Sequence, residues 1–141
     1  MAKNGFSMSN RVAVEEVTGA KTLTANDCGK HLLINASASA NYTITLPTVA
    51  EAGEGWNITC LLQTSGSVAK QVTISKASDD SSGVIKLRQV VTSTDAGAEA
   101  AARSTVIFNA VELKVGDKVE IVAGTENYYA SAFVSGALTG A

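Results

Sequence analysis

The sequence predicts an all-β domain, either an antiparallel β-sandwich or a jelly-roll-like barrel, with an extended arm at its N-terminal end. Apolar and polar residues alternate with a period of two through most of the chain, which is the pattern of half-buried strands. The alternating runs are rich in β-branched residues, which suit a pleated surface. Turn residues separate the runs at intervals of roughly 8–12 residues, a spacing typical of sandwiches and barrels.

The clearest alternation lies in four short runs, at residues 41–47, 55–63, 70–76 and 117–123. In the second run Trp56, Ile58, Cys60 and Leu62 share one face, which we interpret as the core face. Strands with weaker patterns are predicted at residues 12–17, 21–24, 31–35, 84–91, 105–109 and 128–134. Gly, Asn, Asp and Ser mark the turns between them, and Pro47 ends a strand, where its missing N–H does little harm.

The 141 residues are enough for one domain and too few for two ordinary ones. We predict an extended arm over residues 1–10, which are small and polar, and a single β domain over residues 11–141. The Ala-rich stretch Asp95 to Ser104 breaks the alternation and is predicted to be a long loop with at most one helical turn. The sequence shows no internal repeat.

Charge and hydropathy exclude several classes of partner. The net charge is −2 with no cluster of either sign, whereas nucleic-acid binding needs a basic stripe. No apolar run reaches the roughly 20 residues that cross a bilayer, and the N-terminus lacks the apolar segment of a signal peptide. We therefore expect no nucleic-acid or membrane partner and synthesis in a cytoplasm. Charged residues make up only 17%, which suits a surface that packs against neighbours.

The most conspicuous chemical candidate is the pair Cys28 and His31 beside Gly29-Lys30. A cysteine nucleophile needs a base within reach and a group that orients it, and a turn leading into a strand is the simpler interpretation here. A phosphate loop would need glycine at position 24 and Ser or Thr at position 31, and this chain has Thr24 and His31 there. That motif is therefore absent from this stretch.

Other polar groups fit catalysis or metal binding no better. One histidine and two cysteines are too few for a structural zinc site, and both cysteines are expected to be buried thiols. Asp79-Asp80 are expected to lie in a solvated turn, and Glu15 and Glu16 should point to opposite sides of a strand. We expect no catalytic residue, cofactor, metal or small-molecule substrate, and hence no enzyme.

The aromatic residues offer an interface or a carbohydrate platform. Trp56 is assigned to the core because it belongs to an apolar face. Tyr128 and Tyr129 are adjacent on a predicted strand, so one ring should point inward and the other outward. The outward ring is a candidate interface contact, since tyrosine is enriched in contact cores, and both residues are retained as candidates.

An ordered set of motifs resembles small β-domains of tailed-bacteriophage virion proteins. The first has the form Leu-Thr-x-x-Asp-x-Gly-Lys, a strand, then Thr-x-Thr-Leu-Pro, and a glycine followed by an aromatic-containing strand comes next. The last has the form Gly-Asp-x-Val, a strand, then a Gly-Thr-Asn-aromatic-Tyr turn. The matching positions are Leu23, Thr24, Asp27, Gly29, Lys30, Thr43, Thr45, Leu46, Pro47, Gly116, Asp117, Val119, Gly124, Thr125, Asn127, Tyr128 and Tyr129.

The resemblance spans most of residues 21–134 and departs from the family pattern in three places. Glu126 interrupts the Thr-Asn pair, Cys28 replaces a common serine, and the Ala-rich stretch is an insertion. These departures leave the fold prediction intact and bear on the finer assignment of function.

The resemblance implies a structural protein of the virion. Proteins of this family decorate and stabilise capsids as cement proteins, usually as homotrimers on capsomer surfaces, or form parts of head fibres and tails. By this likeness we expect a capsid decoration protein on the virion surface, with itself and the major capsid protein as partners. Gly5 and Phe6 of the arm are candidate attachment residues. A head-fibre or tail component, and a carbohydrate- or host-surface-binding module, remain alternatives.

Overall fold

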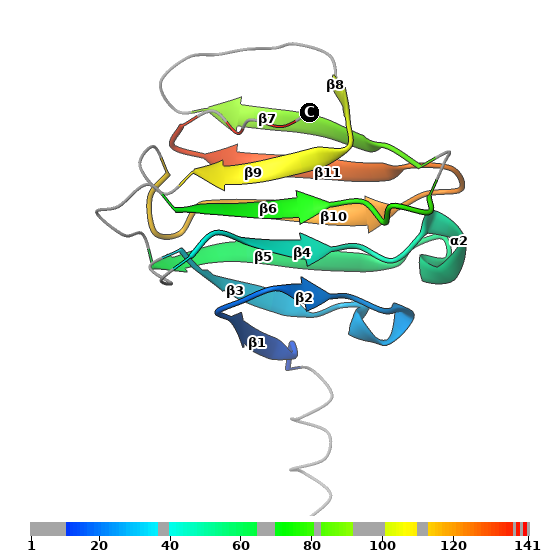
Figure 1. Ribbon diagram of the computed structural model, residues 1–141, viewed down its shortest axis with the longest axis horizontal. Coiled ribbons are helices and arrows are strands. Elements are labelled where there is room, and N and C mark those ends of the chain that lie inside the picture. The colour runs from blue at the N-terminus through cyan, green and yellow to red at the C-terminus, as the bar shows by residue number, and fades with distance from the viewer. Residues whose placement is uncertain are drawn as a thin grey trace, which may run out of the picture.

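The computed structural model describes residues 11–36, 40–64, 70–80, 83–91, 101–109, 113–136, 138 and 140. The predicted arm at residues 1–10, with Gly5 and Phe6, lies outside the described residues. Within the described part, two β-sheets stack face to face with the core between them (Figure 1). The predicted all-β sandwich is therefore confirmed.

Sheet A holds seven strands and sheet B holds four. In spatial order, sheet A contains β1 (Val14–Val17), β3 (His31–Asn35), β5 (Asn57–Thr64), β10 (Lys118–Ala123), β11 (Tyr128–Val134), β7 (Ile85–Val91) and β8 (Ala101–Arg103). Sheet B contains, in the same sense, β2 (Lys21–Thr22), β4 (Tyr42–Thr45), β6 (Gln71–Ser75) and β9 (Thr105–Asn109).

The pairing between strands is mixed, which corrects the expectation of an antiparallel sandwich. In sheet A, β1, β3 and β5 run parallel to one another, and β11 is parallel to β7. In sheet B, β2, β4 and β6 are also parallel. The remaining pairs, β5 with β10, β10 with β11, β7 with β8 and β6 with β9, are antiparallel.

The parallel strands arise because the chain alternates between the two sheets. Each of the pairs β1–β2, β3–β4 and β5–β6 forms a β-arch, with its first strand in sheet A and its second in sheet B. Successive arches stack in register, so that Val14 lies beside His31 and His31 beside Thr59. The fold thus repeats a supersecondary unit that the sequence pattern did not reveal.

Two short helical turns connect the arches, and polar side chains from the sequence cap each of them. A 3₁₀ turn, η1 (Ala25–Asp27), leads from β2 to β3, and the Asp27 carboxylate accepts hydrogen bonds from the backbone N–H and the hydroxyl of Thr24. The helix α2 (Val49–Ala52) leads from β4 to β5, where a turn was predicted. Thr48 and Glu51 form its capping box, each side chain accepting from the other's backbone N–H.

The core consists of the inward side chains of both sheets, and the aromatic residues bridge its layers. Trp56 is buried, as predicted, and meets Tyr128 edge to face with 6.0 Å between ring centroids. The indole N–H donates to the carbonyl of Thr24 at 3.2 Å, and the Tyr128 hydroxyl donates to the carbonyl of Pro47 at 2.7 Å. Both polar groups are therefore satisfied within the core.

Two further sequence predictions are corrected. Cys60 is buried as expected, but Cys28 is exposed because it follows η1 at the surface. In the Ala-rich stretch, Ala101–Arg103 forms β8 and pairs antiparallel with Ile85–Leu87 of β7. Pairing with a long neighbouring strand prevails there over the helix preference of alanine. Residues 95–100 lie outside the described part.

Candidate interaction surface

The outer face of sheet A carries large apolar side chains that point into solvent. Val90, Val122, Tyr129 and Phe133 are 56%, 43%, 54% and 50% exposed. They lie on the adjacent strands β7, β10 and β11, with Val90 paired to Phe133 and Val122 paired to Tyr129. We call these four residues the outer apolar patch. The two pairs are separated along β11 by Ser131. Exposed apolar residues that gather on one face commonly mark interaction sites.

The alternation on β11 determines which residues face outward. Tyr128, Ala130, Ala132 and Val134 are buried, whereas the residues between them are exposed. The prediction that one of the two adjacent tyrosines points inward and the other outward is thus confirmed, and Tyr129 is the outward one. Tyr128 has no exposed surface, so the structure removes it from the predicted interface residues. Burial also raises the pKa of its hydroxyl.

Charged side chains lie among the apolar ones on this face. Ser131 of β11 lies between Arg88 of β7 and Glu120 of β10 in the register of the sheet. Lys118 Nζ lies 3.0 Å from Glu120 Oε1 and 5.2 Å from the centroid of the Phe133 ring. The lysine thus approaches an aromatic face and a carboxylate at once.

Alternation in the sequence places Val122 opposite the core residues, with Lys118 and Glu120, and the structure confirms this. It did not identify Val90 and Phe133 as surface residues, although a signal was present. Each occupies a strand position at which the alternation calls for a polar side chain. Apolar residues in the outward phase of a strand are the pattern that could have identified the patch.

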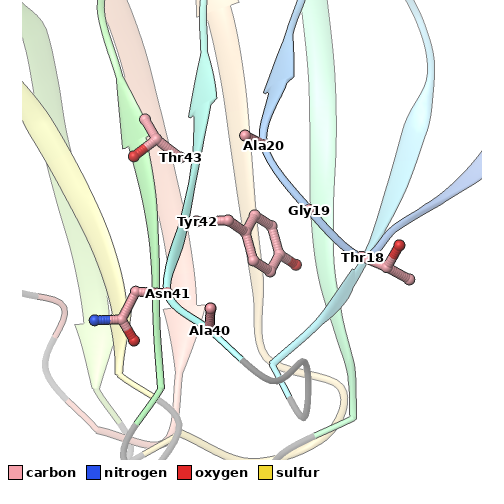
Figure 2. A pocket seen from close by; sticks show the side chains of 7 residues that line it. All are labelled: Thr18, Gly19, Ala20, Ala40, Asn41, Tyr42 and Thr43. Carbon is pink, nitrogen blue, oxygen red and sulfur yellow. The ribbon is translucent and has the colours of Figure 1, made fainter.

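A second feature is a hollow of about 450 Å³ between the start of β4 and the segment that precedes β2 (Figure 2). β2 pairs with β4 only through Lys21 and Thr22, so the segment before it diverges from Tyr42 and Thr43. Figure 2 shows the Tyr42 ring directed toward that segment. The residues around the hollow are Thr18, Gly19, Ala20, Ala40, Asn41, Tyr42 and Thr43.

The hollow offers hydroxyl and amide groups, and its one ionisable side chain is held in a structural role. The Tyr42 hydroxyl lies 2.8 Å from the carbonyl oxygen of Val17 and 3.0 Å from that of Asn35, and it shares its proton between them. Burial raises the pKa of Tyr42 to about 12. The group therefore stays protonated near neutral pH, where it ties β1 and β3 to β4.

An ion network occupies the end of the sandwich formed by the first arch. Glu15 lies 2.6 Å from Lys21 Nζ and 3.0 Å from Lys30 Nζ, and Lys30 also pairs with Asp27 at 2.6 Å. Hydrogen bonds from Lys21 and Lys30 lower the pKa of Glu15. Burial raises the pKa of Asp27, but hydrogen bonds from Lys30 and Thr24 outweigh it, so the net pKa is lowered. The pKa of Lys30 is raised by the hydrogen bonds to both carboxylates.

The remaining candidates from the sequence have structural roles. The residues around Cys28 and His31 form the predicted turn into a strand, and Cys28 Sγ accepts a weak hydrogen bond from Asn57 Nδ2 at 3.9 Å. The Asp80 carboxylate accepts from the backbone N–H groups of Val49 and Gly83, so it braces two connections. Within the described ranges, no group of three or more His, Cys, Asp or Glu side chains gathers as a metal site would require.

Comparison with known proteins yields no assignment: no protein-family model matches the chain and no curated sequence is similar to it. Among the described residues, no helix is long and apolar enough to cross a membrane.

Proposed function

We propose that this protein is a structural component of a bacteriophage virion that binds the outer surface of the head and stabilises it. The observation that carries the proposal is the position of the residues through which the sequence resembles virion β-domains. These residues fix the turns and the core of the sandwich, so the likeness concerns the scaffold itself and extends beyond a local motif.

The first motif contributes both core and turn residues. Leu23 and Leu46 are buried, Asp27 binds Thr24 and Lys30, and Gly29 has a positive φ of 78° that favours glycine.

The last motif, Gly-Asp-x-Val, contributes in the same way, through another turn. Gly116 has a φ of 98°, and the Asp117 carboxylate accepts hydrogen bonds from Lys114 N–H, Ser135 N–H and the Ser135 hydroxyl. The residues of both motifs thus occupy turn and core positions of this scaffold.

A decoration role requires a stable scaffold and several contacts made at once. Two sheets braced by buried hydrogen bonds meet the first requirement, and a homotrimer bound to the major capsid protein meets the second, because linked weak contacts reinforce one another. The proposal assigns no catalytic step, cofactor or small-molecule substrate to the chain.

Immunogold labelling and quantitative mass spectrometry of purified virions test this proposal. We expect label over the head and a fixed number of copies per capsomer. Heads that lack the protein should rupture at a lower temperature and recover when the purified chain is added back. Label confined to the tail, or a few copies per particle, would instead indicate a fibre or tail component. Glycan binding by the isolated chain that Tyr129→Ala abolishes would indicate a carbohydrate module.

A further inference from the structure

We propose that the outer face of sheet A is a two-fold contact between two copies of this chain. The inference rests on the composition and register of that face and is independent of the proposed place of the protein in a virion. It assigns a partner to the outer apolar patch, namely the same patch on a second copy.

The register of sheet A arranges the outward side chains in three rows across the strands. One row runs through Val90, Phe133, Lys118, Leu61 and Leu33. The next contains Arg88, Ser131, Glu120, Thr59 and His31. The third contains Lys86, Tyr129, Val122 and Asn57. The first row is apolar except for Lys118, and the third holds the apolar pair Tyr129 and Val122 between two polar residues. The row between them carries a cation and an anion on either side of Ser131.

The polar row is electrostatically incomplete within one copy. Glu120 pairs with Lys118 of the neighbouring row, whereas Arg88 has no ion pair among the described residues. The cation Arg88 on β7 and the anion Glu120 on β10 lie one strand to either side of β11. If a second copy is rotated by 180° about an axis parallel to β11 and placed on this face, the cation of each copy lies opposite the anion of the other.

The charges also select the direction of the two-fold axis. With the axis along β11, β7 of one copy lies over β10 of the other, so Arg88 faces Glu120 of the second copy twice. With the axis across the strands, Arg88 would face Arg88 and Glu120 would face Glu120, and like charges held opposite one another are unfavourable. The first arrangement is therefore assigned.

The same arrangement pairs the apolar side chains. Phe133 lies over Phe133 and Tyr129 over Tyr129 of the second copy, in the stacked geometry that β-sheets adopt when they pack with strands aligned within about 30°. Lys86 and Lys118 place their methylene stems over Val122 and Val90 of the second copy, which suits amphipathic side chains. Isologous contacts of this kind are the commonest in homo-oligomers.

Sedimentation velocity over a range of concentrations tests the contact. We expect the wild-type chain to associate in even multiples, with two copies, or six if the chain also forms the proposed homotrimer. Phe133→Asp should weaken this association about tenfold or more, because it places a charge at a contact centre. Val115→Asp is the matched control, because Val115 is 63% exposed and lies outside the patch. Far-ultraviolet dichroism verifies that both variants are folded.

A charge exchange identifies the two-fold partner. Arg88→Glu and Glu120→Arg should each weaken the association, and the double variant should regain most of it, since the opposite charges again face each other. A wild-type chain that is only monomeric or trimeric would overturn the proposal. A double variant that associates no more tightly than the weaker of the two single variants would overturn it as well. If the wild-type chain stays monomeric or trimeric and Phe133→Asp abolishes binding to heads, the patch contacts the shell and the two-fold contact is refuted.

Discussion

At the scale of single residues, the two adjacent tyrosines show how one side-chain position determines a role. Tyr128 is buried and donates its hydroxyl to the Pro47 carbonyl, whereas Tyr129 is 54% exposed. We expect Tyr128→Phe to lower the free energy of unfolding by about 1–3 kcal/mol, because it leaves a buried carbonyl without its donor. Urea denaturation followed by tryptophan fluorescence measures this change.

Tyr129→Phe removes the same atom at the neighbouring position and serves as the control. Its free energy of unfolding should stay within about 0.5 kcal/mol of the wild type, as is usual for surface substitutions. Equal effects of the two substitutions would contradict the assigned roles. Sequence alternation predicted that one ring points inward, but only the pairing of β11 with β10 and β7 determines which one, and those partners are distant in the chain.

At the scale of elements, the connections between strands depend on particular backbone conformations. Gly116 precedes β10 with a φ of 98°, a region that side chains with a Cβ rarely adopt. Gly116→Ala should therefore lower the free energy of unfolding by about 1–2 kcal/mol. Gly19→Ala is the matched control, because Gly19 lies outside that region and has nothing within 4 Å of an added Cβ. Thermal denaturation of both variants distinguishes the two positions, and an equal loss at Gly19 would contradict the conformational explanation.

The ion network of the first arch predicts how stability depends on pH. The folded-state pKa values of Glu15 and Asp27 lie below their ordinary values of 4.5 and 3.8. In the window just below those values the unfolded chain binds more protons than the folded chain, so stability is lost as the pH falls through it. Urea denaturation from about pH 6 down to about pH 2.5, the range in which carboxylates titrate, should show this decline. Glu15→Gln should flatten it, whereas Glu126→Gln, at an exposed position outside the network, should leave it as in the wild type.

The sequence predicted the strands more completely than the pairing between them. β3, β9 and β11 match the predicted residues 31–35, 105–109 and 128–134, because alternation and turn residues are local signals. The parallel pairing of the arches was missed, since a period of two reports which face a residue occupies and carries no information on the direction of the neighbouring strand. β8 was missed for a related reason, because its strand conformation depends on pairing with β7.

At the scale of the whole molecule, the strands differ in how many neighbours hold them. β5, β10 and β11 each pair on both sides within sheet A, whereas β1 pairs only with β3 among the described strands. Native-state hydrogen exchange should therefore show the amides of β1 and β2 opening at a lower free energy than those of β5, β10 and β11, because the ends of a fold open locally first. Uniform protection across all these strands would indicate that the first arch unfolds only with the rest of the domain.

The stacking of arches has a consequence for how the domain can vary in size. Because each arch adds one parallel strand to each sheet, the unit is modular. An additional rung inserted between the first and second arches would lengthen the sandwich by one strand spacing, roughly 4.8 Å. Glu15 of β1 and Lys21 of β2 form an ion pair on the terminal arch, and Lys30, just before β3, also pairs with Glu15. Charges on an edge strand discourage further strands from adding. Charged residues on the terminal arch thereby disfavour the addition of a further strand to either sheet at this end.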